Sequence, residues 1–388
     1  MKPLSLLFIM SFLVFVDVRI LTPVLPSISD SLGASPGAVG LAMTTYSLAY
    51  GLGQLIFGPL SDRAGRIAVV RAAGIAFSVF TILSALTMSA WQFIGARLLV
   101  GAFAGAVIPL TLVFIGDTVE YDRRQAVLGR FSMITSSALA FSASIGGTIA
   151  HFMSWRFMLI GYGLLALIPI GLMWRIKAPR PCVSSEATPG FGDILRDRRA
   201  QFIYIAVFLE GTLCWGGMTY LGSFAATRYS LDQFSVGLLV ALFGIGMMTG
   251  GFLMGRIRSF LSENALAALG GTLMGGTYLA LIPRWPPAVF AVSLLLMGLG
   301  YVSLHTTLQL RGTEILPAAR GKAFSLFAFT LFSGIGAGSA LFGRFVDAGL
   351  YEMMFAIAGI GLTAIGWATT LSPPRSAAGT PPATCIAE

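Results

Sequence analysis

Two carboxylic acids stand inside long apolar stretches of the chain. Asp17 lies within SFLVFVDVRILTPVL, and Glu210 lies within AVFLEGTLCWGG. An ionisable group surrounded by hydrocarbon is costly, and proteins keep such groups where they face a cavity, exchange protons or hold a counter-ion. Both acids are therefore candidates for proton transfer or for binding a positively charged group.

Arg97 is a basic side chain that matches Asp17 in depth. Asp17 lies about 13 residues into its apolar run, or about 20 Å at 1.5 Å per residue, and Arg97 lies about 6 residues from the far end of the fourth run. Desolvation favours the neutral form of a carboxyl group, whereas a nearby guanidinium favours its ionised form. Small changes in the distance between Asp17 and Arg97 could therefore switch the protonation of Asp17. The alternatives are a permanent ion pair between helices, or pairing of Asp17 with Arg19 on its own helix.

Aromatic residues follow Glu210, among them Trp215 and Tyr220. A buried acid beside aromatic rings can bind an amine through charge and ring contacts. Glu210 could instead be a second proton site, or stay neutral and hydrogen-bonded to a neighbouring helix.

His305, in VSLHTTLQL, can change its charge near neutral pH. The alternative is a structural hydrogen bond to Thr306 or Thr307. With His305 included, the candidate substrate contacts are Arg19, Glu210, Trp215, Tyr220 and His305.

Composition predicts the elements that must position these residues. Of 388 residues, 56% are hydrophobic and 11% charged, with a mean hydropathy of +0.84, whereas a typical soluble domain is about 25% charged. The chain divides into about twelve apolar runs of about 20 residues, the length of a membrane-spanning helix. We therefore expect an all-α membrane protein. The predicted helices are 4–26, 37–60, 67–88, 91–116, 126–151, 156–176, 200–226, 234–255, 262–282, 286–310, 321–344 and 349–372.

The basic residues are distributed unevenly between the two sides of the predicted membrane. With a cytoplasmic N-terminus, most of the 25 Lys and Arg residues fall on cytoplasmic segments. This positive-inside pattern predicts that both termini are cytoplasmic. Because the charge is spread over short loops, the sequence pI near 9.8 does not indicate a nucleic-acid partner. The exceptions are Arg156, Arg228, Arg284 and Arg344 outside, and Arg19 and Arg97 within helices.

The chain also divides into two similar halves. A shift of 196 residues matches Gly147 with Gly343, and a shift of 193 residues matches Arg63 with Arg256. Weak internal symmetry at half the length is typical of transporters built from two six-helix repeats. We predict a first bundle at 1–176, a cytoplasmic linker at 177–199, a second bundle at 200–372 and a cytoplasmic tail at 373–388.

The segment GPLSDRAGR, residues 58–66, joins the second and third predicted helices. Glycine permits tight turns and close helix approach, and an aspartate can meet a helix dipole or an arginine. The segment resembles the loop between helices 2 and 3 of the major facilitator superfamily, and Asp117 resembles its partner at the end of helix 4. The resemblance implies a gate that latches the cytoplasmic ends of the two bundles; the alternative is simple anchoring at the membrane interface. The gating residues are Gly58, Asp62, Arg63, Gly65, Arg66 and Asp117.

The wider stretch YSLAYGLGQLIFGPLSDRAGR resembles the drug:proton antiporter branch that includes bicyclomycin and chloramphenicol resistance exporters, and the segment around Arg97 agrees with it. ARLLVGAFAGAVIP places Arg97 and Gly101 at the spacing of the branch's helix 4 motif. Residues 138–147, ALAFSASIGG, depart from the helix 5 signature of this branch: Gly146 and Gly147 remain, but Ser142 and Ala143 replace its Gly-Pro pair, so the proline kink usually associated with antiport is missing. Small residues there still allow close packing against a neighbouring helix.

The resemblance implies a twelve-helix fold in two pseudo-symmetric bundles, with helices 1, 4, 7 and 10 around a central cavity. It also implies proton-coupled export of small organic, amphipathic compounds (multidrug-type efflux) by a monomer in the bacterial inner membrane, with Asp17, Arg97 and Glu210 as the proton-coupling residues. The expected partners are the substrate, protons and the lipid bilayer. The alternatives are a proton-coupled importer, a dedicated metabolite permease, or a receptor or scaffold that does not transport.

The sequence offers little for enzymatic chemistry. The three cysteines, Cys182, Cys214 and Cys385, are too dispersed to suggest a disulfide framework or a metal cluster. No phosphate-binding loop with the Gly-Lys-Ser/Thr ending is present, so a built-in ATPase is excluded. We expect no cofactor and no enzymatic activity.

Overall fold

The described parts of the chain consist of helices. The computed structural model describes residues 3–176, 191–257, 259–313 and 320–371, apart from several side chains within helices. The first half contains α1 (Pro3–Asp17), η1 (Thr22–Val24), α2 (Leu25–Leu32), α3 (Pro36–Ala64), α4 (Arg66–Ala85), α5 (Ala90–Thr118), α6 (Tyr121–Phe152) and α7 (Trp155–Met173). The second half contains α8 (Phe191–Arg196), α9 (Arg198–Glu210), η2 (Gly211–Trp215), α10 (Gly216–Thr219), α11 (Leu221–Tyr229), α12 (Gln233–Ile257), α13 (Glu263–Ala280), α14 (Pro287–Thr313), α15 (Arg320–Asp347) and α16 (Tyr351–Leu371).

The outside of the bundle is apolar, as lipid contact requires. Large hydrophobic side chains such as Trp91, Phe252 and Ile360 are exposed on helix surfaces, which would be unfavourable in water. Nine helices or helix pairs in the described residues are long and apolar enough to cross a membrane. Every predicted segment overlaps a helix. The helices α3, α6 and α13 are not among the nine, and their glycine and hydroxyl-bearing residues lower their mean hydropathy. The count of twelve spans therefore stays a prediction.

Two predicted continuous helices are broken in the structure. The segment predicted at 4–26 ends as α1 at Asp17, passes through a turn at residues 18–21, and continues as η1 and α2. Pro23 cannot donate a backbone hydrogen bond, which favours the break. The segment predicted at 200–226 ends as α9 at Glu210 and continues through the π-helical turn η2. The first break therefore begins at Asp17, whereas the second segment changes to a π-helical turn directly after Glu210 and is interrupted at Tyr220.

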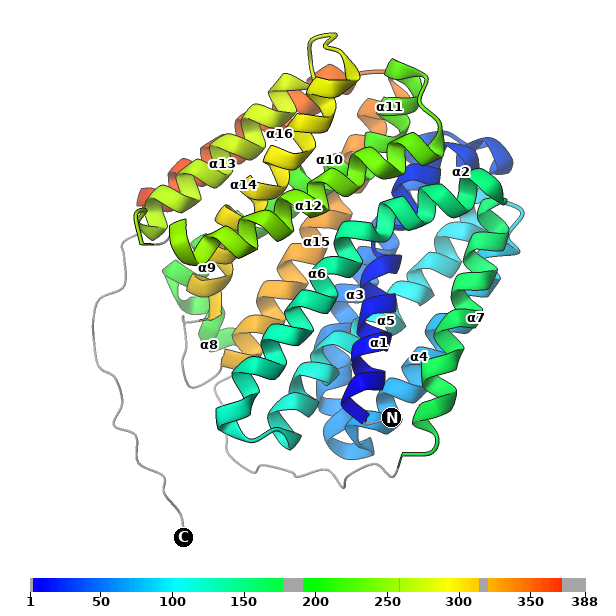
Figure 1. The fold of residues 1–388 in the computed structure, drawn as a ribbon, viewed down its shortest axis with the longest axis vertical. Coiled ribbons are helices and arrows are strands. Elements are labelled where there is room, and N and C mark those ends of the chain that lie inside the picture. Colours follow the sequence, from blue (N-terminus) through cyan, green and yellow to red (C-terminus); the bar gives the residue numbers. More distant parts are fainter. Residues whose placement is uncertain (1–2, 177–190, 258, 314–319, 372–388) are drawn as a thin grey trace.

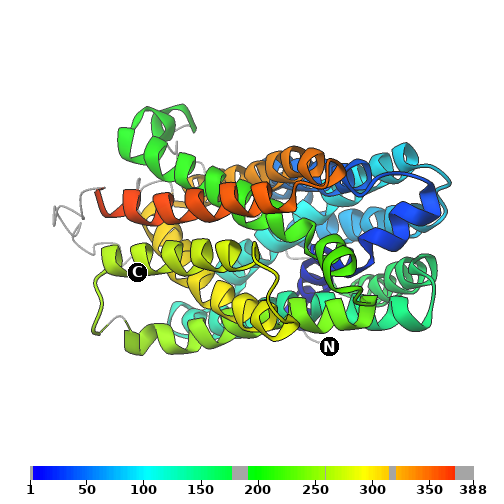
Figure 2. The same cartoon turned by 90° about the horizontal axis from the view of Figure 1, so that it is seen from above.

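The two halves of the chain lie on opposite sides of the molecule (Figures 1 and 2). Within the first half α3 packs on α5, and within the second half α12 packs on α14. Between the halves, α3 packs along α15, and α6 packs along α12. The small residues on α6 have the packing role expected of them, since Gly147 lies directly against Gly237 of α12.

Capping residues set several helix boundaries. Ser35, Ser89 and Ser262 each accept a backbone N–H in the first turn of α3, α5 and α13. Gly65 separates α3 from α4 with a positive φ of 88°, a conformation that glycine adopts without a steric penalty. The helix α8 and the start of α9 at Arg198 fall within the linker predicted at 177–199, so helical structure resumes earlier than expected; the bundle boundaries stay predictions.

Candidate functional site

Asp17 and Arg97 form a buried two-point ion pair. Arg97 Nη1 donates to Asp17 Oδ1 at 3.0 Å, and Nη2 donates to Oδ2 at 2.9 Å. Both side chains are fully buried. A planar guanidinium that engages both carboxylate oxygens is the strongest common arrangement of such a pair. The structure thus brings together two residues from predicted helices 1 and 4, and the pairing of Asp17 with Arg19 is absent.

The surroundings of this pair join three helices of the first half. The Arg97 guanidinium carbon lies 4.7 Å from the centre of the Tyr46 ring on α3. A side chain at Gly101 would collide with the backbone of Tyr46, so this glycine permits the close approach of α5 to α3. On α1, Ser11 exchanges a hydrogen bond with Thr111 of α5 at 3.2 Å. The pair is therefore enclosed by contacts among α1, α3 and α5.

Glu210 pairs with His305 in the second half. His305 Nδ1 lies 3.0 Å from Glu210 Oε2, and Glu210 is fully buried. His305 does not bond Thr306 or Thr307, whose hydroxyl groups donate to carbonyl oxygens of their own helix. Glu210 stands 193 residues after Asp17, at the corresponding place in the second half. Each half thus ends a helix on an acid and pairs it with a base from its fourth predicted helix.

A row of rings connects His305 to Arg19 across the two halves. The His305 ring stacks on Tyr301 with centroids 4.8 Å apart, and Tyr301 meets the Trp215 ring edge-on at 5.0 Å. The Arg19 guanidinium carbon lies 4.0 Å from the centre of the Trp215 ring, a cation–π contact. Arg19 comes from the break after α1, and Trp215 comes from the π-helical turn after α9. Short π-helical turns are frequent at functional sites.

A central cavity of about 320 Å³ lies between the halves. Predicted contacts Arg19, Trp215 and His305 line it, whereas Glu210 and Tyr220 do not. The Tyr220 hydroxyl instead donates to the Ser339 carbonyl at 2.6 Å. The described lining is Phe15, Val18, Arg19, Tyr50, Gln54, Ile108, Pro109, Thr135, Trp215, Met247, Tyr301, His305, Gln309, Phe324, Phe327, Ala328, Leu331, Phe332 and Ile335.

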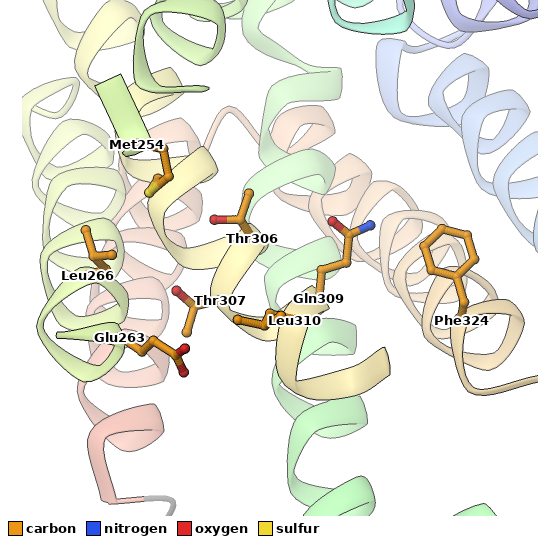
Figure 3. A pocket seen from close by; sticks show the side chains of 8 residues that line it. All are labelled: Met254, Glu263, Leu266, Thr306, Thr307, Gln309, Leu310 and Phe324. Atoms are coloured by element: carbon orange, nitrogen blue, oxygen red, sulfur yellow. The ribbon is translucent and has the colours of Figure 1, made fainter. Parts of the chain in front are cut away.

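A second pocket, of about 340 Å³, lies among α12, α13, α14 and α15 (Figure 3). Figure 3 shows Glu263 and Thr307 on one side of it, and Gln309 and Phe324 on the other. Gln309 and Phe324 also line the central cavity. The two spaces therefore adjoin, and the second one lies toward the end of the bundle that carries Arg66.

The predicted gating residues lie at this end, called the Arg66 end below. Arg66 Nε donates to Asp117 Oδ2 at 3.3 Å, and Arg66 Nη1 donates to Ser61 Oγ at 2.6 Å. Arg63 is exposed. Gly58 lies inside α3 with nothing within 4 Å of a Cβ position, so the close helix approach expected there is absent. The side chain of Asp62 lies outside the described residues.

A charge-reversed counterpart occurs at the Arg66 end of the second half. Arg311, at the end of α14, donates to the Thr369 carbonyl at 2.8 Å and to Asn264 Oδ1. Its Nε lies 3.9 Å from Glu263 Oε2, at the start of α13. The sequence comparison of the halves missed this cluster because it matched like residues, whereas acid and base exchange places here.

Contacts between the halves gather at the opposite end, called the Asp347 end below. Asp347 of α15 accepts hydrogen bonds from Gly37 N at 2.8 Å and Ser35 Oγ at 2.7 Å, at the start of α3. His151 Nδ1 lies 3.1 Å from Asp232 Oδ2. These residues were not singled out from the sequence. They close the Asp347 end in this structure.

Asp232 also caps α12. Ser235 N donates to Asp232 Oδ1 at 2.9 Å. The hydrogen bonds from Ser235 lower the pKa of Asp232, and the nearby His151 adds to that shift. Because these bonds favour the ionised carboxylate, they stabilise this arrangement at neutral pH.

Acidic, thiol and imidazole side chains do not gather in groups of three anywhere in the described residues. The structure therefore offers no metal centre within 3–176, 191–257, 259–313 and 320–371. Cys182 and Cys385 lie outside these ranges, and Cys214 is buried.

The helical fold, the apolar surface and the cavity between two halves define a multi-pass membrane transporter. The chain belongs to the Major Facilitator Superfamily, whose family model matches residues 7–339. The superfamily resemblance seen in GPLSDRAGR is thereby confirmed, as is the all-α major facilitator fold.

The chain is similar to several bacterial proteins. The chain is 27% identical over 371 residues to a "Probable sugar efflux transporter" of Helicobacter pylori (strain G27), covering 93% of this chain and 91% of the relative. It is 27% identical over 335 residues to a "Chloramphenicol resistance protein" of Pseudomonas aeruginosa, covering 81% and 78%. The fold is similar to the crystal structure of a bacterial homolog of the human lysosomal transporter Spinster, with a TM-score of 0.75, 16% identity, and coverage of 95% and 94%.

Proposed function

We propose that the protein exports small organic compounds in exchange for protons by alternating access. The observation that carries this proposal is the fully buried Asp17–Arg97 pair beside the break in the first helix. A buried pair of this kind is costly for a structure that never changes. It suits a protein in which protonation of the acid must alter the helix arrangement. The names of the bacterial relatives support export as the direction.

Protonation of Asp17 would weaken its bond to Arg97, because a neutral carboxyl group loses the charge attraction. The link between α1 and α5 would then loosen. Arg19 stands two residues after Asp17, so the same movement would change the cavity wall. A proton that enters from outside and binds Asp17 would in this way favour release of the substrate. It would also favour the return of the carrier to the inward-facing state, since a ligand shifts the equilibrium toward the conformation that binds it more tightly.

Glu210 and His305 supply a second titratable pair in the same mechanism. His305 lines the cavity, and Glu210 lies directly behind it. A substrate that touches His305 would perturb the pair without contacting Glu210. We infer that Glu210 takes part in proton coupling and that Arg19, Trp215 and His305 contact the substrate.

The two ends of the bundle would open alternately. The Asp347 end is held across the halves by Asp347 with Ser35 and Gly37. At the Arg66 end, the Arg66–Asp117 pair lies within the first half and the Arg311–Glu263 pair within the second. We infer that the Arg66 end faces the cytoplasm, from the positive-inside distribution of basic residues. The protein would then be an inner-membrane monomer with cytoplasmic termini.

Accumulation assays test this function. An efflux-deficient bacterium expressing the wild type, Asp17→Asn or Asp30→Asn is incubated with a panel of lipophilic dyes, chloramphenicol and sugars. We expect the wild type and Asp30→Asn to lower accumulation of at least one compound, and an uncoupler or Asp17→Asn to abolish the effect. Asp30 is an exposed acid on α2 and serves as the matched control.

Other outcomes point to the alternatives. Increased uptake by energised cells would identify an importer. Export that resists the uncoupler would contradict proton coupling, and full activity of Asp17→Asn would contradict the role of the buried pair.

A further inference from the structure

Arg19 is a buried guanidinium with unused hydrogen-bonding capacity. Its side chain is 3% exposed, and its Nε and Nη1 atoms have no hydrogen-bond partner in the described parts of the chain. Asp17 engages Arg97 through both carboxylate oxygens. Glu210 engages His305 through Oε2, and its Oε1 has no hydrogen-bond partner in the described residues, Arg19 included. Buried donors without an acceptor are unfavourable, so an acceptor is expected in the working cycle.

The geometry of Arg19 favours recognition of an anion. Its guanidinium carbon lies 4.0 Å from the Trp215 ring centre, which holds the planar group against the indole. A guanidinium fixed in this way offers a fork of parallel donors that matches a carboxylate or a similar oxyanion. Lysine or histidine could not present the same arrangement.

The charge of the cavity points in the same direction. Arg19 is the one permanently charged side chain in the described lining, which contains no carboxylate. Glu210 lies behind His305 and does not reach this lining. Within the described lining of the cavity, a substrate therefore meets the positive charge of Arg19 and no carboxylate.

The remaining walls are suited to an apolar body. Phe15, Tyr50, Tyr301, Phe327 and Phe332 contribute aromatic rings to the lining. Gln54 and Gln309 add neutral polar groups. The volume of about 320 Å³ lies in the range of small-molecule sites, which is about 300–1,000 Å³.

We propose that the transported compounds are organic anions, with one carboxylate-like group held by Arg19 and an aromatic or apolar body held by the surrounding rings. This inference rests on the proposed transport function and specifies its substrate class. It differs from one of the interpretations that the sequence left open, in which Glu210 binds an amine.

Binding to the purified protein tests the substrate class without any ion gradient. Calorimetry on the protein in lipid nanodiscs would compare three probes with the same aromatic body: 2-naphthoate, methyl 2-naphthoate and 2-naphthylmethylamine. We expect the wild type to bind 2-naphthoate about tenfold or more tightly than the ester, and the amine most weakly, because a charge-assisted bond is lost in both. Arg19→Gln should lose this preference while still binding the ester, which shows that it is folded.

Two further variants sharpen the comparison. Arg19→Lys keeps the charge but loses the fork, and should retain a reduced preference for 2-naphthoate. Arg71→Gln is the matched control. Arg71 also lies over a tryptophan ring, with its guanidinium carbon 4.9 Å from the centre of Trp174. Unlike Arg19, it does not line the cavity. Arg71→Gln should bind all three probes as the wild type does.

Equal binding of 2-naphthoate and its ester, preference for the amine, or an unchanged preference in Arg19→Gln would overturn the proposal. So would undetectable binding of 2-naphthoate at millimolar concentration. Selective anion binding combined with failure of the accumulation assay would reject proton-driven export and keep the anion site. Proton-driven export of neutral or cationic compounds alone would reject the anion site and keep the transport function.

Discussion

Asp17 and Glu210 occupy corresponding positions, each at the end of a helix and each paired with a base from the same half. Their partners differ in an important way. Arg97 is a guanidinium that binds both oxygens of Asp17. His305, in contrast, is an imidazole that contacts one oxygen of Glu210 and also lines the cavity. The second pair is therefore the one that a substrate in the cavity can contact directly. The fold provides two titratable links, one on each side of the cavity.

Glu210→Gln tests the assignment of the second pair. Because Glu210 does not line the cavity, we expect this variant to slow transport of neutral, anionic and cationic compounds alike, by about tenfold, since it loses one charge-assisted bond. Initial transport rates in cells, corrected for the amount of protein, are the measurement. Glu352→Gln changes an exposed acid and should have no effect. A selective loss of cationic compounds would show that Glu210 contacts the substrate after all.

Asp232→Ala tests the pH dependence at the Asp347 end. Its lowered pKa means that Asp232 stabilises the protein above the ordinary pKa of an aspartate, about 3.9, and that this contribution disappears as pH falls through the lowered value. We expect Asp232→Ala to lower the melting temperature by about 1 to 3 °C at pH 7, from loss of the α12 cap. The difference from wild type should shrink as pH falls below about 3.9 and the carboxylate becomes protonated. His151→Gln keeps the cap of α12 and serves as the control. A difference in melting temperature between Asp232→Ala and wild type that does not change with pH would contradict the explanation.

At the residue scale, sequence found the acids more readily than their partners. Asp17 and Arg97 could be matched because both are charged, rare and similar in depth. His305 could not be assigned to Glu210, because helix rotation is not fixed by the sequence and two threonines stand beside it. Tyr220 looked like a binding residue, but its hydroxyl packs against Ser339 between α3 and α15.

Discontinuous helices are the main feature at the scale of elements. In membrane transporters, breaks in spanning helices expose backbone groups only where they face protein or a cavity. Here the turn after α1 presents Arg19, and η2 presents Trp215, so both breaks supply the cavity wall. The hydrophobic pattern of the sequence predicted the positions of these membrane segments. It did not predict the breaks, because the residues on both sides of each break are apolar.

The latch between Asp347 and the start of α3 sets the preferred conformation. Asp347→Ala removes an acceptor from Gly37 N and Ser35 Oγ, and leaves the positive end of the α3 dipole without its carboxylate. We expect the Asp347 end to open more often. Spin labels at Ser31 and Leu350, in a cysteine-free background, would show a larger long-distance population in this variant. Asp30→Ala is the control, and distance distributions identical to wild type would contradict the latch.

Orientation belongs to the scale of the whole molecule. The distribution of basic residues predicts a cytoplasmic linker and tail, which contain Cys182 and Cys385. A membrane-impermeant maleimide should therefore leave the protein unlabelled in right-side-out vesicles and label it after permeabilisation. Cys214 is buried and should not react. The double variant Cys182→Ser/Cys385→Ser should remain unlabelled even after permeabilisation. Labelling of the wild type in right-side-out vesicles would contradict the predicted topology.

At this scale the sequence predicted the class well, because composition and spacing of apolar runs follow from the thickness of the membrane. The superfamily was identified from GPLSDRAGR, a short segment with a demanding backbone at Gly65. The arrangement between the halves was less accessible. Asp347 and Ser35 lie more than 300 positions apart, and no local pattern indicates their contact.

The most direct test of proton exchange uses inside-out membrane vesicles that have been acidified by respiration. A fluorescent weak base reports the pH gradient, and the compound that cells exclude most strongly in the accumulation assay is then added. We expect the gradient to fall in vesicles with the wild type or Asp30→Asn, as protons leave in exchange for the compound, and to persist with Asp17→Asn. Compound uptake without a change in the gradient, or an equal fall with Asp17→Asn, would contradict proton exchange through the Asp17–Arg97 pair.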